Sequence, residues 1–357
     1  MPTMKHRRIR ILPLLILFCS GCDVAYLFHA AAGQFHLLND SIPITEALNE
    51  RSLPPDEQER LRLVARIKAF GEKELGLKKT DNYETVYLSS SQRPVYTVSA
   101  SPKDRLRQKT WWFPFIGDIP YLGFFDMEKA KRELDRLAAQ YLDVSIGVAD
   151  AYSTLGWFKD PVTLNLIQGS TFSLAEIILH EMTHTTFYLK GQSAFNEGLA
   201  VLVGTVGAFR FFGQAFGPTH PFTLQAQGVI EDERLFSRFL EVLMDELEGL
   251  YGSSLSYGEK LTQREAIFTR SLENFKDLSK KFKTDRFARF GQRPLNNATI
   301  LIAGLYHRRF DLFEAVLKSK EGSIRDVLLF LEGLSKENDD LLDALEVRLQ
   351  DDITPHT

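Results

Sequence analysis

The stretch from residue 180 to residue 197 constrains the fold of this chain more than any other feature of its sequence. It reads His180-Glu181-Met-Thr-His184, and Glu197 follows after twelve further residues. An α-helix turns about 100° and rises about 1.5 Å per residue, so the two imidazoles lie on one face, one turn apart. Both rings can then reach a single zinc ion at roughly 2.0–2.1 Å. The spacing therefore predicts a metal site built on a helix.

Local signals predict where that helix begins and ends. Ser173 and Glu176 match a Ser-x-x-Glu capping box, which predicts a helix start at this point. Apolar residues follow at helical spacing, and Gly191 predicts the stop. A second helix is expected to begin near Ser193 and to bring Glu197 back toward the imidazoles.

The residue types in this stretch predict separate chemical roles. His180, His184 and Glu197 are the candidate ligands, and three protein ligands leave the fourth zinc position open for water, as in a catalytic rather than a structural site. Glu181 lies beside the metal face without pointing at the ion, which suits a general base acting on the activated water. The competing interpretation is that the motif arose by chance and that the histidines are hydrogen-bonded core residues.

The N-terminus predicts export. Residues 1–10 contain four basic and no acidic residues, an apolar run follows from Ile11 to Phe18, and Ser20-Gly21-Cys22 comes next. This pattern is typical of a secretory signal peptide, and the run is too short to span a bilayer, which needs about 20 apolar residues. Ser-Gly-Cys resembles a bacterial lipobox, which implies cleavage before Cys22 and lipid attachment to its thiol. The alternative is an ordinary signal peptide with an unrelated cysteine.

The cysteine count and the net charge limit the kinds of metal site and partner that this protein can have. The chain has two cysteines, Cys19 and Cys22, so cleavage and acylation would leave no free thiol and exclude a cysteine-based metal site. Without residues 1–21 the chain would carry 39 basic and 47 acidic residues, which argues against nucleic acid as a partner. We expect a lipid-anchored protein of the bacterial cell envelope that faces the periplasm, and Asp23 slightly favours the inner membrane.

The rest of the chain reads as α+β. Strands are expected in the first half, and helices from Ser173 onward. The expected strands are 83–88, 95–98, 111–116 and 142–148, and the expected helices are 55–75, 126–141, 221–251, 260–283, 295–308 and 322–348. The expected organisation is a signal peptide (1–21), a membrane-proximal segment (22–50) and one domain (51–357), divided into a strand-containing part (51–170), the metal-site helices (171–213) and a helical part (214–357).

This layout resembles the zincin type of metallopeptidase, in which a sheet precedes the metal helix and its edge strand receives extended substrate. Residues 150–158 precede the metal helix where such an edge is expected. An aromatic turn that packs in the core is the alternative for this segment.

Stretches across most of the chain also resemble a family of bacterial lipoproteins grouped as putative aminopeptidases. The resembling stretches are 20–22, 33–38, 43–44, 120–126, 151–158, 180–184, 190–191, 194–197 and 296–298. The resemblance implies zinc as cofactor, a peptide as substrate, His180, His184 and Glu197 as metal ligands, and Glu181 as catalytic base. The chain departs from the family pattern at Thr183, Thr185-Thr186 and Gln192-Ser193, which puts substrate preference rather than metal binding in question.

Two points stay open from the sequence. The donor that stabilises the reaction's oxyanion is Tyr306 or Tyr152, unless both are packed tyrosines. The predicted activity is that of a membrane-anchored zinc peptidase, either an exopeptidase or an endopeptidase. The rival classes are a lipoprotein binding module with structural zinc and an inactive descendant of a peptidase, and an intact Glu181 argues against both.

Overall fold

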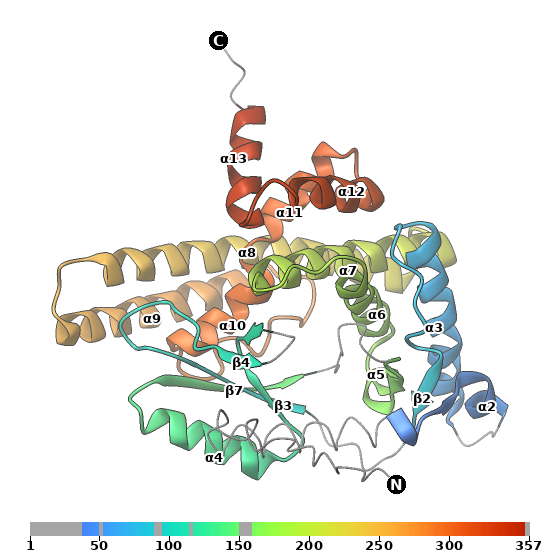
Figure 1. Cartoon of the computed structure of the whole chain (residues 1–357), viewed down its shortest axis with the longest axis horizontal. Coiled ribbons are helices and arrows are strands. Elements are labelled where there is room, and N and C mark those ends of the chain that lie inside the picture. Colours follow the sequence, from blue (N-terminus) through green and yellow to red (C-terminus); the bar gives the residue numbers. More distant parts are fainter. Residues whose placement is uncertain (1–37, 50–52, 89–94, 114–116, 150–158, 354–357) are drawn as a thin grey trace, which may run out of the picture.

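The computed structural model describes residues 38–49, 53–88, 95–113, 117–149 and 159–353. Small sheets occupy the N-terminal half and helices dominate the C-terminal half, which confirms the predicted α+β class (Figure 1). The strands are β1 (Ile42–Pro43), β2 (Thr85–Tyr87), β3 (Val95–Ser101), β4 (Trp111–Phe113), β5 (Gly117–Ile119), β6 (Leu122–Phe124), β7 (Asp143–Ala149) and β8 (Val162–Thr163). The helices are α2 (Ile44–Asn49), α3 (Pro55–Lys73), α4 (Met127–Ala138), α5 (Leu164–Gln168), α6 (Thr171–Thr186), α7 (Ser193–Phe216), α8 (Pro221–Gly252), α9 (Tyr257–Ser279), α10 (Asn297–His307), α11 (Phe310–Ser319), α12 (Ile324–Leu334) and α13 (Leu341–Ile353).

The sheet nearest the predicted site has the order β6-β3-β7 and is antiparallel throughout. Its central strand pairs along its whole length with β7, from Val95 opposite Ala149 to Ser101 opposite Asp143. Val98 and Ala100 point into a core that α4 covers. Asp126 caps α4 by accepting a hydrogen bond from the Lys129 backbone, which fixes this helix beside the sheet.

The start of α10 is fastened to the start of β7. The Asp143 carboxylate accepts the backbone N–H of Asn297 at 3.0 Å and pairs with Arg264 at 2.7 Å. The Asn296 side chain donates to the Val144 carbonyl at 3.0 Å while it also caps α10. These contacts hold the helix that carries Tyr306 at a fixed place relative to the sheet.

The second small sheet and the main core lie around the helices α6 and α7. Its order is β1-β2-β8, with β2 antiparallel to β1 and parallel to β8. The largest apolar cluster joins α3, α6, α7, α8, α11 and α12. In the described part of the chain α7 alone is long and apolar enough to cross a membrane, and 67 % of its most apolar window is buried inside the protein. Its packing is that of a core helix.

Three predictions of local structure were wrong. Helix α6 begins at Thr171, because Ser170 rather than Ser173 caps it, and Glu176 makes an ion pair instead of completing a capping box. The expected helix over 322–348 is two helices, α12 and α13, separated by a polar stretch from Ser335 to Asp340. Helix α11 was missed, and β5, β6 and the short α5 were also absent from the prediction.

Candidate metal centre and its cavity

The predicted metal helix and the helix after it both form, although α6 ends at Thr186, before the predicted stop at Gly191. Asn196, the residue before Glu197, accepts the backbone N–H of Leu189 at 2.9 Å and donates to the Leu189 carbonyl at 2.7 Å. Gly191 turns the chain with a φ of 82°, a conformation that glycine adopts without strain. These contacts fasten the start of α7 to the end of α6 and so set the position of Glu197.

The two helices approach closely at Gly204. A Cβ atom at this position would lie 2.8 Å from the Glu176 carbonyl oxygen and 3.2 Å from the Cβ of His180. Only a residue without a side chain allows this contact. The absence of a Cβ therefore lets α7 lie directly against the face of α6 that carries the histidines.

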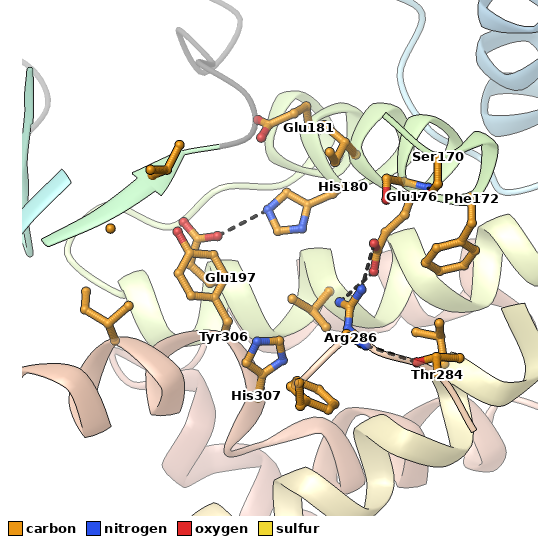
Figure 2. Close-up of a pocket in the computed structure, with 18 of the residues that line it drawn as sticks. Ser170, Phe172, Glu176, His180, Glu181, Glu197, Thr284, Arg286, Tyr306 and His307 are labelled. Carbon is orange, nitrogen blue, oxygen red and sulfur yellow. Dashed lines mark hydrogen bonds and ion pairs between the residues drawn. The ribbon is translucent and has the colours of Figure 1, made fainter. Parts of the chain in front are cut away.

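The three predicted ligands are brought together by this packing, and Figure 2 shows two of them, His180 and Glu197, pointing toward each other. The Nε2 atoms of His180 and His184 are 3.1 Å apart, and Oε2 of Glu197 lies 3.2 Å from the first and 3.5 Å from the second. Donor atoms of a tetrahedral zinc site with bonds of 2.0–2.1 Å are spaced by about 3.3 Å. The donor triangle therefore fits a metal ion in size and in ligand type.

The charges in this cluster also favour a cation. Burial by itself would raise the pKa of Glu197, but the charge of His184 and the hydrogen bond of His180 outweigh it and hold this pKa far below its usual range. Burial by itself would lower the pKa of His184, but the Glu197 carboxylate raises it. Glu197 is thus an ionised and mostly buried carboxylate, a state that requires a compensating positive charge nearby.

Glu181 lies beside the donor triangle, on the cavity wall. Its Oε2 atom is buried and has no hydrogen-bond partner among the described residues. A carboxylate oxygen held in this way has its hydrogen-bonding capacity unused by the described residues. The position suits the predicted general base.

A cavity of about 820 Å³ opens over the three donor residues. Gly147 and Val148 of β7 line one wall, and Phe172 and Arg286 line another. Figure 2 shows the His180 ring pointing toward Glu197, with Tyr306 beside Glu197 and Glu181 on the other side of His180. The cavity therefore joins the exposed edge of the sheet to the candidate metal centre.

Two tyrosines flank the centre of the cavity. Tyr306 stacks on His180, with ring centroids 6.4 Å apart and an interplanar angle of 29°. Tyr121, between β5 and β6, lines the same cavity as Tyr306 and was not singled out from the sequence. Its stretch was noted only as part of the family resemblance, and no spacing rule links it to the histidines.

A second polar cluster lies one turn along α6. Arg286 pairs with the Glu176 carboxylate at 2.7–2.8 Å and also with Glu233, whose other oxygen contacts Nδ1 of His307 at 2.9 Å. Thr205 donates to Glu176 at 3.0 Å. The sequence did not predict this cluster, because its members come from five separate segments.

The remaining candidate residues, Cys22 and Tyr152, lie outside the described residues, as does the predicted substrate ledge over 150–158. The Asn296-Asn297-Ala298 stretch starts α10, where its side chains hold the sheet and do not reach the cavity lining.

The fold and the site define a class: an α+β protein with a His-His-Glu donor set beside a large cavity. The chain belongs to the family described as "Putative aminopeptidase", which it matches over residues 25–340. No curated protein and no solved structure matches the chain.

Proposed function

We propose that this protein is a zinc-dependent peptidase with a zincin-like fold. We further propose that it is an aminopeptidase, which is the activity that its family name gives. The observation that carries the proposal is the triangle of donor atoms from His180, His184 and Glu197. Imidazole and carboxylate ligands suit zinc, and three protein ligands suit a catalytic rather than a structural site. Membership of the aminopeptidase family supports a peptide as substrate.

A zinc ion in this site supplies Lewis acidity, which acidifies water and polarises a carbonyl group. Glu181 takes a proton from the attacking water as the water oxygen bonds to the carbonyl carbon. Glu181 then returns that proton to the nitrogen as the C–N bond breaks. Its unpartnered, buried Oε2 atom supports this role.

The edge of the sheet supports a binding mode for extended peptide. Among the described strands β7 pairs only with β3, and Gly147 and Val148 line the cavity. An unpaired strand edge offers N–H and C=O groups to a peptide laid beside it. We infer that substrate adds to β7 as a further strand and so passes over the donor triangle.

The proposal includes the lipid anchor. The basic start, the apolar run and Ser20-Gly21-Cys22 support attachment to the bacterial cell envelope through Cys22. The test is incorporation of labelled palmitate into the full chain expressed in bacteria. The Cys22→Ala variant should take up no label, and an unlabelled wild-type chain would contradict the anchor.

The catalytic assignment is tested with Glu181→Gln in the full, detergent-solubilised chain. Zinc content measured by elemental analysis should stay at one ion per chain, while hydrolysis of a peptide library falls by about 10²–10⁴-fold. The matched control is Glu337→Gln at an exposed glutamate, which should leave turnover unchanged. Full turnover by Glu181→Gln would remove Glu181 from its role.

The same library separates the rival classes. A structural zinc site or an inactive descendant predicts bound zinc with no cleavage by the wild-type chain. Peptides with free and with acetylated N-termini separate the two peptidase types, because an aminopeptidase cleaves only the free form.

A further inference from the structure

The outer face of the β4–β5 pair presents a tryptophan to solvent. Trp112 lies opposite Asp118 in this pair, and 68 % of its surface is exposed. Successive side chains of a strand point to opposite faces, so Trp111 and Phe113 point the other way, into the apolar cluster of the β6-β3-β7 sheet and α4. The strand therefore holds Trp112 outward. Its ring is apolar and its indole N–H is polar, which suits a boundary between water and an apolar phase.

The segment between β3 and β4 (Figure 1) carries basic side chains on its outer side. Leu106 of this segment packs in the apolar cluster that α8, α9 and α10 form, and Gln108 donates to the Pro120 carbonyl at 2.8 Å. Because these two side chains point inward, the residues at the alternate positions are directed outward, and Arg105 and Arg107 are exposed. The basic residues occupy these alternate positions and are Lys103, Arg105, Arg107 and Lys109.

The basic segment is joined to the strand that carries the tryptophan. The Lys109 N–H donates to the Ala100 carbonyl at 2.8 Å. The ammonium group of Lys109 lies 5.4 Å from the centre of the Trp111 ring. The basic residues and the exposed ring thus belong to one continuous stretch of surface, residues 103–112, which we call the Trp112 surface.

The charge of the Trp112 surface is opposite in sign to that of the protein. Residues 103–112 contain four basic residues and one acidic residue, Asp104, whereas the whole chain has a net charge of −4. Asp104 pairs with Arg105 at 3.1 Å, while Arg107 and Lys109 make no ion pair with any described residue. Unpaired cations beside an exposed tryptophan suit an anionic bilayer, where the cations meet phosphate groups and the ring lies at the level of the headgroups.

The proposed lipid anchor keeps this surface near a membrane. Leu38, the first described residue, is sixteen positions after Cys22. A chain of this length reaches at most about 55 Å. An anchored protein therefore stays at a high local concentration beside the lipid surface, where a weak second contact is enough to orient it.

The Trp112 surface adjoins the cavity of the candidate metal centre. Tyr121, which follows β5, lines that cavity. Gly117, at the start of β5, lies against the connection between α6 and α7, since a Cβ atom there would be 3.0 Å from the Cε of Lys190. An orientation that places the β4–β5 pair on lipid therefore also holds the cavity close to the membrane.

We propose that the Trp112 surface docks on anionic lipid headgroups and so orients the anchored protein with its cavity beside the membrane. The inference rests on the proposed lipid anchor and does not depend on zinc or on peptidase activity.

The test places the full, lipidated chain in vesicles of an equimolar mixture of phosphatidylcholine and phosphatidylglycerol with brominated acyl chains. Bromine quenches the emission of a tryptophan that reaches the acyl chains, and the chain has three tryptophans. Part of the wild-type emission should be quenched, and Trp112→Phe should abolish that quenching. The matched control is Trp111→Phe at the inward-facing neighbour, which should keep it.

The charge dependence is measured in the same vesicles. The double variant Arg107→Gln, Lys109→Gln should lower the ratio of docked to undocked protein about 30-fold, since each basic side chain near an anionic surface contributes about fivefold. The control is Lys318→Gln, Lys336→Gln at two exposed lysines of the C-terminal helical part, which should leave the quenching unchanged. Vesicles of brominated phosphatidylcholine alone should quench little.

Flotation of the chain with the vesicles separates the anchor from the docking surface. A chain that floats without quenching, that is quenched equally on neutral and anionic vesicles, or that stays quenched in Trp112→Phe overturns the proposal. A dimer that Trp112→Phe dissociates, in a chain without quenching, would assign the surface to a second copy instead. A chain that does not float overturns the anchor and the docking together, whereas digestion of the peptide library decides the peptidase function alone.

Discussion

Two polar clusters beside α6 contain similar side chains but differ in how their charges are paired. One contains His180, His184 and Glu197, and the other contains Glu176, Glu233 and His307 around Arg286. Both offer histidine and carboxylate groups that a metal could bind. The residue types therefore do not tell a metal centre from a structural ion-pair cluster.

The two clusters differ in how their charges are balanced and in whether their lone pairs accept hydrogen bonds. In the second cluster the guanidinium of Arg286 lies between two carboxylates, so donors face acceptors and most of the charge cancels. In the first, two imidazole nitrogens face each other at 3.1 Å beside an ionised carboxylate. Lone pairs converge in this way around a shared proton or a cation, so the first cluster could hold a metal ion, whereas the charges of the second are already paired.

The largest effect should come from removing a carboxylate from each cluster in turn. Glu197→Ala should lose bound zinc and at least about 10³-fold of peptidase activity, because it removes one of three ligands. Glu176→Gln should keep one zinc per chain, because its charge is balanced by Arg286. Elemental analysis after dialysis measures the zinc content of both variants. Equal zinc content in wild type and Glu197→Ala would mean that Glu197 is not a metal ligand.

A smaller effect is expected when the second cluster loses its cation. Arg286→Met should lower the free energy of unfolding by about 3–5 kcal/mol, because Glu176 and Glu233 would be left buried and uncompensated. Urea titration of the metal-free chain measures this. The matched control is Arg238→Met, which breaks the exposed pair with Asp311 and should cost at most about 1 kcal/mol. Equal costs would mean that the buried cluster contributes no more than a surface pair.

The smallest effect concerns pH. Burial by itself would raise the pKa of Glu233, but the charges of His307 and Arg286 outweigh it and hold this pKa below the ordinary 4.5. A lowered carboxyl pKa stabilises the fold above the unfolded value, and that stabilisation is lost as pH falls through the folded value. Glu233→Gln should therefore lose less unfolding free energy than wild type between pH 6 and pH 3. An identical pH slope in the two proteins would contradict the ion-pair assignment.

The sequence predicted the two helices and the three donor residues of the candidate metal centre because their signals are local. The spacing of His180, His184 and Glu197 depends on two neighbouring helices and the short turn between them. The helix start was wrong because Ser170 and Ser173 are equally good caps. Glu176 was misread for a different reason, because its partner Arg286 is 110 residues away and no local pattern connects them.

The parts of the site that the sequence did not predict also depend on residues far apart in the chain. Tyr121 and Tyr306 line one cavity although they are 185 positions apart in the chain, so no local pattern connects them. The break between α12 and α13 was missed because apolar residues continue at helical spacing on both sides of a polar stretch. Periodicity finds such helices but does not find where one ends and the next begins.

The glycine contact between α6 and α7 has a consequence for how the centre is assembled. Backbone packing at Gly204 sets the spacing of the two helices, so the donor triangle depends on a contact far from its own side chains. Gly204 lies two helical turns beyond Glu197, so even a methyl group there would wedge the helices apart and carry the carboxylate away from the imidazoles. Saturation mutagenesis of this codon should therefore find no functional replacement, although the residue never meets the ion.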